Sequence, residues 1–232
     1  MSDTAIHSPQ PEDCLTAGHY IDSVHPAVIA LAQNAVSGLE NEIDQAVALY
    51  QTVRDCVSYT PYRPYTNKRM FHVGSCLADN KGCCIEKSAL LAACARTVGI
   101  PARVGYADVK NHLSTPRLLE ILETDVFHWH GYTELWLQGR WVKATPVFDQ
   151  TLCNKIGVEP LEFTGLANSI FHPHNSQGQP HMEYLLDRGN YSDVPAELVM
   201  SELAFYYPKL VRECGDDGSF LKEVEGSTCV DH

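Results

Sequence analysis

The spacing of hydrophobic residues along the chain predicts helices in its first half. In residues 41–56, apolar side chains recur at intervals of three and four positions, which gives a helix one apolar face. Those side chains are Ile43, Ala46, Val47, Tyr50 and Val53. An earlier helix is expected to begin at Pro26, because proline suits the first turn, and to end at Gly38. Further on, Pro61 and Pro64 indicate an extended loop.

The middle of the chain reads as a helix followed by strands. A third helix is expected to begin near Cys84 and to close at Gly99, since glycine readily adopts the left-handed conformation of a helix C-terminus and Pro101 cannot continue the helix. The elements expected after it are a strand at 103–109, a short helix at 115–123, and strands at 130–137 and 140–145 in a hairpin around Gln138-Gly139. Residues 150–194 should be irregular, and a last helix should cover 195–206.

The chain reads as one domain with polar ends. Its 232 residues are enough for a sizeable core, and no repeat divides them. We predict a weakly ordered N-terminal arm at residues 1–22, a single domain at 23–213 and a polar C-terminal tail at 214–232.

Composition and charge narrow the set of functions. A net charge of −12 argues against nucleic acid or an anionic membrane as a partner. No stretch approaches the roughly 20 apolar residues of a membrane span. The nine cysteines are an odd number, and the polar start of the chain lacks the basic and apolar segments of a signal peptide. We therefore expect a cytoplasmic protein whose thiols are free.

Cys84 is the candidate nucleophile. A thiolate does the chemistry in thiol enzymes, and the unpaired N–H groups and dipole at a helix N-terminus favour that negative charge. Cys84 is placed there, and Gly82 allows close approach of the backbone before it. Cys83 has the same neighbourhood, but adjacent helical side chains point about 100° apart, so at most one of the two faces a base.

Histidines at the start of the 130–137 strand are candidate bases. His130 begins the alternating set on that strand, where a neutral imidazole near Cys84 can take its proton. His128 is its rival, two residues earlier. A carboxylate orients an imidazole strongly and a hydroxyl weakly, so Asp149 and Thr145 are both candidates for the orienting group.

Three ordered segments resemble the transglutaminase-like superfamily. They are Gly-x-Cys on a helix that ends in Gly-Ile-Pro-Ala-Arg, a His-x-Tyr-x-Glu strand and a Gly-x-Trp-Val strand, within about residues 41–150. The resemblance implies a papain-like α+β fold, in which N-terminal helices and the nucleophile helix pack on an antiparallel sheet. The C-terminal region, with Leu161-Glu162-Phe163 and Phe171-His172-Pro173-His174, looks like that of an uncharacterised bacterial subgroup.

The resemblance also implies a Cys–His–Asp triad. By position, the nucleophile carries over to Cys84 and the base to His130. The acid of the family falls just before a proline, in the slot that Thr145 occupies here before Pro146. Asp149 must therefore substitute for that acid, or the triad is incomplete.

The function that follows is thiol-dependent acyl transfer or hydrolysis on a peptide or small amide, through a thioester on Cys84 and without a cofactor or metal. One alternative is a binding protein with a decayed site, which the missing acid favours. Another is a metal enzyme, whose candidate ligands are His128, His130, His172, His174 and His181.

We expect a narrow cleft with aromatic walls drawn from Tyr59, Tyr62, Tyr65, Trp129, Tyr132 and Trp136. Asp108, Asn111 and His112 either line that cleft or cap a loop.

Overall fold

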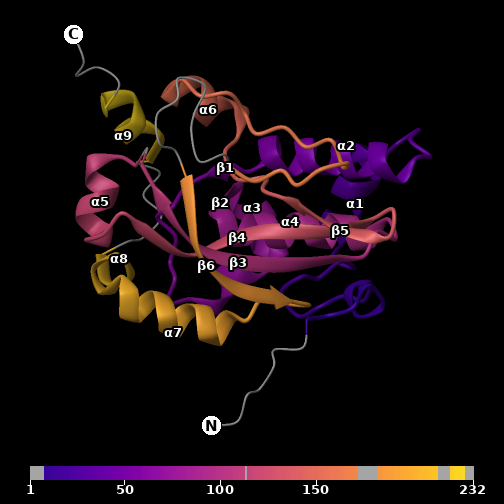
Figure 1. Ribbon diagram of the computed structural model, residues 1–232, viewed down its shortest axis with the longest axis horizontal. Coiled ribbons are helices and arrows are strands. Elements are labelled where there is room, and N and C mark those ends of the chain that lie inside the picture. Colours follow the sequence, from indigo (N-terminus) through magenta and orange to yellow (C-terminus); the bar gives the residue numbers. More distant parts are fainter. Residues whose placement is uncertain (1–7, 113, 172–181, 214–219, 228–232) are drawn as a thin grey trace.

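A four-stranded antiparallel sheet of order β5-β4-β3-β6 organises the chain (Figure 1). The computed structural model describes residues 8–112, 114–171, 182–213 and 220–227. The strands of the sheet are β3 Ala102–Asn111, β4 Val126–Leu137, β5 Arg140–Ala144 and β6 Met182–Tyr191. A short parallel pair, β1 Ser58–Tyr59 and β2 Lys81–Gly82, leads into the central helix.

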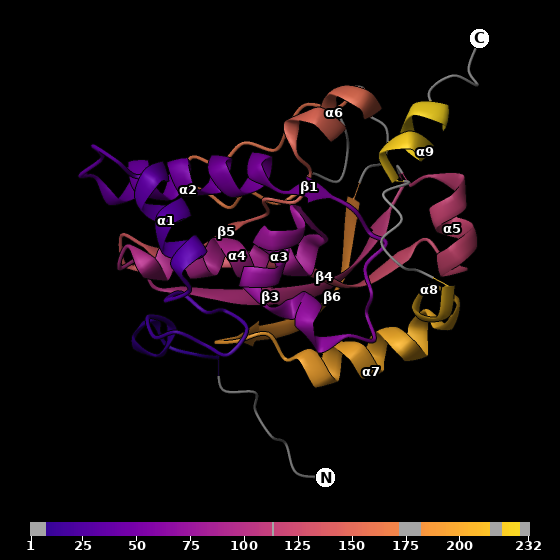
Figure 2. The same ribbon diagram turned by 180° about the vertical axis from the view of Figure 1, so that it is seen from behind.

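The central helix α4, Cys84–Thr97, lies against one face of β3 and β4 (Figure 2). Every residue from Ile85 to Arg96 is buried, because the sheet covers one side of the helix and other helices cover the rest. Those helices are α1 Pro26–Ala35, α2 Glu42–Cys56 and α3 Val73–Asp79. The helix and the sheet are joined by a hydrogen bond of 2.8 Å that Thr133 Oγ1 donates to the carbonyl of Ser88.

Local sequence signals set the ends of several elements. Asn41 caps α2 by accepting the N–H groups of Ile43 and Asp44. The hairpin between β4 and β5 turns at Gln138 and Gly139, both of which have positive φ angles, as a tight two-residue turn requires. The helices expected from Pro26, over 41–56 and from Cys84, together with this hairpin, are confirmed.

An irregularity interrupts the pairing of β3 and β4. Ala107 pairs with His130 and Val109 with Phe127, so the register shifts around Asp108. Trp129 takes a left-handed conformation at this point, with φ of 61°. Such bulges bend a strand and redirect its side chains, so simple alternation does not hold from His128 to His130.

The segment 150–194 is more regular than its composition suggests. It contains α6, Gln150–Ile156, and the edge strand β6, which pairs with β3. The hydrophobic pattern misses β6 because the strand lies at the edge of the sheet and exposes Leu185 and Leu186. Three other helices also lie beside the sheet. They are α5 Pro116–Leu122, α7 Ala196–Tyr206 and α8 Pro208–Glu213.

Both ends of the chain contain packed segments, contrary to the sequence expectation. Residues 8–22 include a short 3₁₀ helix, Pro11–Cys14, and the side chains of Cys14 and Ile21 are fully buried. The carboxylate of Asp193 holds this segment by accepting backbone N–H groups, including that of Ile21 at 2.8 Å. At the other end, α9, Phe220–Ser227, sets the ring of Phe220 against those of Tyr59 and Tyr62. Residues 1–7, 214–219 and 228–232 lie outside the described residues.

Candidate active site

Cys84 is the first residue of α4 and is partly exposed. Several neighbours lower the pKa of its thiol below the ordinary value. The largest cause is a hydrogen bond from the thiol of Cys83, and the backbone N–H groups of Gly131 and Ile85 add to it, while burial opposes them. Burial raises the pKa of each of the other six described cysteines, so Cys84 is the described thiol that most readily ionises.

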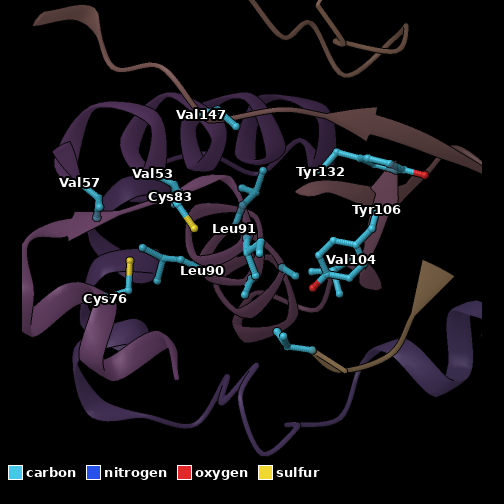
Figure 3. Close-up of a cluster of buried hydrophobic side chains, with 14 of the residues drawn as sticks. Val53, Val57, Cys76, Cys83, Leu90, Leu91, Val104, Tyr106, Tyr132 and Val147 are labelled. Atoms are coloured by element: carbon cyan, nitrogen blue, oxygen red, sulfur yellow. The ribbon is translucent and has the colours of Figure 1, made fainter. Parts of the chain in front are cut away.

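Cys83 differs sharply from its neighbour. Its side chain is 2% exposed and points into the cluster of buried apolar side chains beside α4 (Figure 3). Burial raises the pKa of this thiol well above its ordinary value, and the hydrogen bond to Cys84 raises it further. Cys83 therefore stays protonated and acts as a donor to the Cys84 sulfur.

A buried ion pair fixes the start of α4. The carboxylate of Glu86 accepts the backbone N–H of Cys83 at 2.9 Å, as in a capping box, and pairs with the guanidinium of Arg63 at 3.0 Å. Arg63 is also paired with Asp79 at 2.8 Å. Because Arg63 belongs to the proline-containing loop after β1, the pair ties that loop to the helix N-terminus.

Gly131 brings β4 into direct contact with the start of α4. A Cβ atom added to Gly131 would lie 3.0 Å from the carbonyl oxygen of Cys84 and 3.0 Å from the Cα atom of Ile85. Only glycine allows this approach, which lets its N–H reach the Cys84 sulfur. The residue before it is His130, so the backbone of the candidate base runs beside Cys84.

The ring of His130 is buried among aromatic side chains. Its centroid lies 6.0 Å from that of Phe171 and 6.5 Å from that of Tyr184. Burial lowers the pKa of His130 to about 4, so the imidazole is neutral at pH 7. Its Nε2 atom is buried without a hydrogen-bond partner. The described structure shows no hydrogen bond between this ring and Cys84 or Asp149.

Asp149 and Thr145, the two candidates for the orienting group, occupy different positions. Asp149 caps α6, and its carboxylate accepts the N–H of Leu152 at 3.0 Å and that of Tyr59 at 2.9 Å. Thr145 is buried, and its Oγ1 has no partner. The role of Asp149 toward His130 stays a prediction.

A carboxylate does orient the rival imidazole. His128 Nδ1 lies 2.8 Å from Oδ2 of Asp108, whose other described partners include the guanidinium of Arg188, 2.8 Å away through Nη2. Although burial opposes it, the hydrogen bonds from Arg188 and His128 lower the pKa of Asp108, which stays ionised. The ring of His128 also stacks on Tyr206, with centroids 3.7 Å apart. Sequence reasoning proposed Asp108 for the cleft but not for this pair, since Arg188 lies 80 residues away along the chain.

Cys84, His128 and His130 border one narrow cavity of about 50 Å³. Tyr59, Tyr65 and Trp129 are among its walls, as the sequence predicts. Tyr62, Tyr132 and Trp136 are not among them. The hydroxyl of Tyr62 donates to Glu223, Lys143 covers the ring of Tyr132, and Trp136 packs edge-on against Trp141. The remaining walls include Phe127 of β4, Ile85 of α4 and aliphatic side chains of α5, α7 and α8.

Within the part of the chain that the structure describes, no group of three or more histidine, cysteine or acidic side chains is arranged to hold a metal ion. Three of the metal candidates, His172, His174 and His181, lie outside the described residues. Among the described helices, none is both long and apolar enough to cross a bilayer.

No curated protein matches the chain. The solved structures that match include the two that follow. A "putative cysteine protease" from Cytophaga hutchinsonii has a TM-score of 0.49 and 15% identity, over 84% of this chain and 52% of that one. A "putative protease" from Parabacteroides distasonis has a TM-score of 0.37 and 17% identity, over 58% of this chain and 25% of that one. The chain thus spans about half the length of the first protein and a quarter of the second.

The packing of α4 on an antiparallel sheet agrees with the papain-like α+β fold that the family resemblance implies. A family model described as the transglutaminase-like superfamily matches residues 29–146, about half of the chain, and includes Cys84 and His130. The chain therefore belongs to the transglutaminase-like superfamily.

Proposed function

We propose that the protein is a thiol enzyme that transfers or hydrolyses the acyl group of an amide through a thioester on Cys84. The observation that carries the proposal is the state of Cys84, which has a lowered thiol pKa and borders a cavity shared with two imidazoles. Family membership supports thiol chemistry of this general kind. A peptide or a small amide is the proposed substrate.

In the proposed first step, the Cys84 sulfur attacks the amide carbonyl. The bond from sulfur to carbon forms, the bond from carbon to nitrogen breaks, and the amine leaves with the proton that the imidazole took from the thiol. Backbone N–H groups at the start of α4 favour the negative charge that develops near the sulfur and the carbonyl oxygen. Water or a second amine then resolves the thioester, with the imidazole again as base.

His130 is the proposed base, because it has the position of the base in the motif that the sequence resembles, and Gly131 holds its backbone beside Cys84. Its neutral state at pH 7 leaves the imidazole free to accept a proton. Asp149 is the proposed orienting group, because it is the carboxylate that follows soon after Thr145, the slot of the family's acid. His128, which Asp108 already orients, is the competing base. His130→Ala and His128→Ala form a matched pair, and the proposal requires the larger fall in turnover from His130→Ala.

The test of the nucleophile is limited alkylation with iodoacetamide at neutral pH, followed by mass mapping. Cys84 should be labelled first, and Cys84→Ser should remove the fast phase. With a cleavable amide, a thiol enzyme releases a burst of amine equal to the enzyme present, because acylation and deacylation are separate steps. Preferential labelling of Cys56 or Cys153 would remove the central claim.

A binding protein on the same scaffold is the second candidate, and Thr145 in the acid slot is the observation that favours it. Such a protein would bind a ligand in the same cavity but would give neither a burst nor an acyl adduct on Cys84. Intact-mass measurement after incubation with amides separates the two functions, since an acyl adduct adds a defined mass to the chain.

A further inference from the structure

The cavity beside Cys84 has an apolar inner wall. That wall is built by α5, the start of β4, α7 and α8, through Leu118, Leu122, Phe127, Leu203 and Leu210. The lining residues that the structure describes include no lysine, arginine, aspartate or glutamate. A substrate group that enters this space therefore meets hydrocarbon and aromatic carbon.

The polar groups of the lining are largely occupied by the protein itself. The hydroxyl of Tyr65 donates to the carbonyl of Pro61 at 2.8 Å, and that of Tyr207 donates to the carbonyl of Val126 at 2.7 Å. His128 uses Nδ1 on Asp108. Two buried atoms of lining residues have no partner, Nε1 of Trp129 and Nε2 of His130. The described lining therefore offers nitrogen atoms that can bind one carbonyl group, but it offers no lysine or arginine to pair with a carboxylate.

The energetics favour an apolar acyl group in this space. A charged or amide-bearing side chain would lose its water without finding partners, at a cost of about 1–3 kcal/mol for an amide and more for a charge. Each methylene moved from water to the cavity contributes roughly 0.8 kcal/mol. That gain corresponds to about a fourfold increase in kcat/KM for each added methylene, as long as space remains.

The size of the cavity limits the length of that group. Its volume is about 50 Å³, whereas about 10–15 Å³ measured in the same way holds one water. The space is therefore large enough for more than a single water but small, which suits a short acyl chain rather than a long one.

Leu118 and Phe127 separate this cavity from a second one. The second cavity, of about 40 Å³, lies under α9, where Phe220 and Val224 line it. Tyr59, Leu118 and Phe127 border both spaces, so they form the partition between them. Removal of the Leu118 side chain would join the two.

Resting on the proposed function, we infer that the acyl group received by Cys84 is short, uncharged and apolar, and that Leu118 sets its maximum length. The substrates are thus amides of short aliphatic acids. The acyl carbonyl lies at the sulfur, the chain fills the apolar space, and the amine lies outside it.

The experiment uses the full chain and a series of straight-chain acyl p-nitroanilides from acetyl to octanoyl. Nitroaniline release gives kcat/KM, and intact mass detects the acyl adduct on Cys84. We expect kcat/KM to rise about fourfold per methylene up to butyryl or valeryl and then to fall. Glutaryl p-nitroanilide, which carries a carboxylate on a chain of similar length, should react at least tenfold more slowly than the valeryl compound. A best substrate of octanoyl length, or a glutaryl compound as good as valeryl, would overturn the inference.

Variants of Leu118 test the partition. Leu118→Ala should move the best chain length upward by about two to three carbons, the size of the side chain removed. Leu118→Met is the matched control, because it nearly conserves volume and should keep the wild-type optimum. If Leu118→Ala does not fold, the wild-type profile alone still decides the length and charge claims. An unchanged optimum in folded Leu118→Ala would overturn the role of Leu118.

Failure of the inference and failure of the proposed function give different results. If acyl adducts form on Cys84 without a preference for short apolar chains, only the inference fails. If no compound in the series acylates Cys84 and iodoacetamide also prefers another cysteine, both fail.

Discussion

The hydrogen bond from Cys83 to Cys84 leads to a prediction about the reactivity of the nucleophile. Cys83→Ala removes one buried sulfur and leaves the backbone N–H of residue 83 free to keep its 2.9 Å bond to Glu86. The variant takes away the largest cause of the lowered Cys84 pKa. We therefore expect the Cys84 pKa to rise and the pH profile of alkylation to move to higher pH.

The size of the effect on alkylation follows from the charge of the hydrogen-bond acceptor, which is the Cys84 thiolate. A hydrogen bond to a charged group contributes about 1.5–3 kcal/mol, which lowers the thiolate fraction roughly 10- to 100-fold at a pH below both pKa values. A thiolate of higher pKa is also the better nucleophile, and this offsets nearly half of the loss on a logarithmic scale. The net expectation is alkylation roughly four to fifteen times slower on the acid side of the profile.

The assay is the rate of iodoacetamide labelling of Cys84 between pH 5 and pH 9, read by mass mapping. Cys83→Ser is the matched control, because its hydroxyl keeps a donor at nearly the same position and should preserve most of the rate. Thermal unfolding of each variant separates the loss of the donor from the loss of packing in the core. A folded Cys83→Ala protein that labels Cys84 at the wild-type rate at every pH would refute the reasoning.

Three further predictions concern His130, Gly131 and Asp149. His130 has a pKa of about 4 in the folded protein and roughly 6.5 when unfolded, so below pH 6.5 the unfolded chain binds a proton that the folded chain does not. Stability should then fall by about 3 kcal/mol from pH 7 to pH 4 through this group alone, and urea unfolding of His130→Gln should lack that part of the loss. Gly131→Ala should cost about 1–3 kcal/mol and slow the labelling of Cys84, because the new Cβ lies 3.0 Å from backbone atoms of Cys84 and Ile85; wild-type melting and labelling would contradict this. Asp149→Ala should lose about 1–2 kcal/mol as the α6 cap is removed, whereas Asp149→Asn, which retains an acceptor oxygen, tests the orienting role: unchanged rates and pH dependence would exclude it.

Features that depend on short-range interactions could be predicted from the amino-acid sequence. The apolar face of α2, the Gln138-Gly139 turn and the limits of α4 rest on interactions between residues a few positions apart. The motifs around Cys84 and His130 also resemble those of the superfamily that the family model identifies. The edge strand β6 was missed, because its exposed leucines follow no core pattern and its stability comes from pairing with β3.

The environment of the site was decided by tertiary structure. The Cys84 thiol owes its lowered pKa partly to the N–H of Gly131, which is 47 positions away along the chain and is brought close by the packing of β4 on α4. The pairing of His128 with Asp108 and Arg188 requires β3, β4 and β6 to be neighbours in one sheet. Sequence alone thus determined which residue types were available for thiol chemistry. Only the folded chain decided their charge states and partners, because burial and hydrogen bonding act between segments that are distant in sequence.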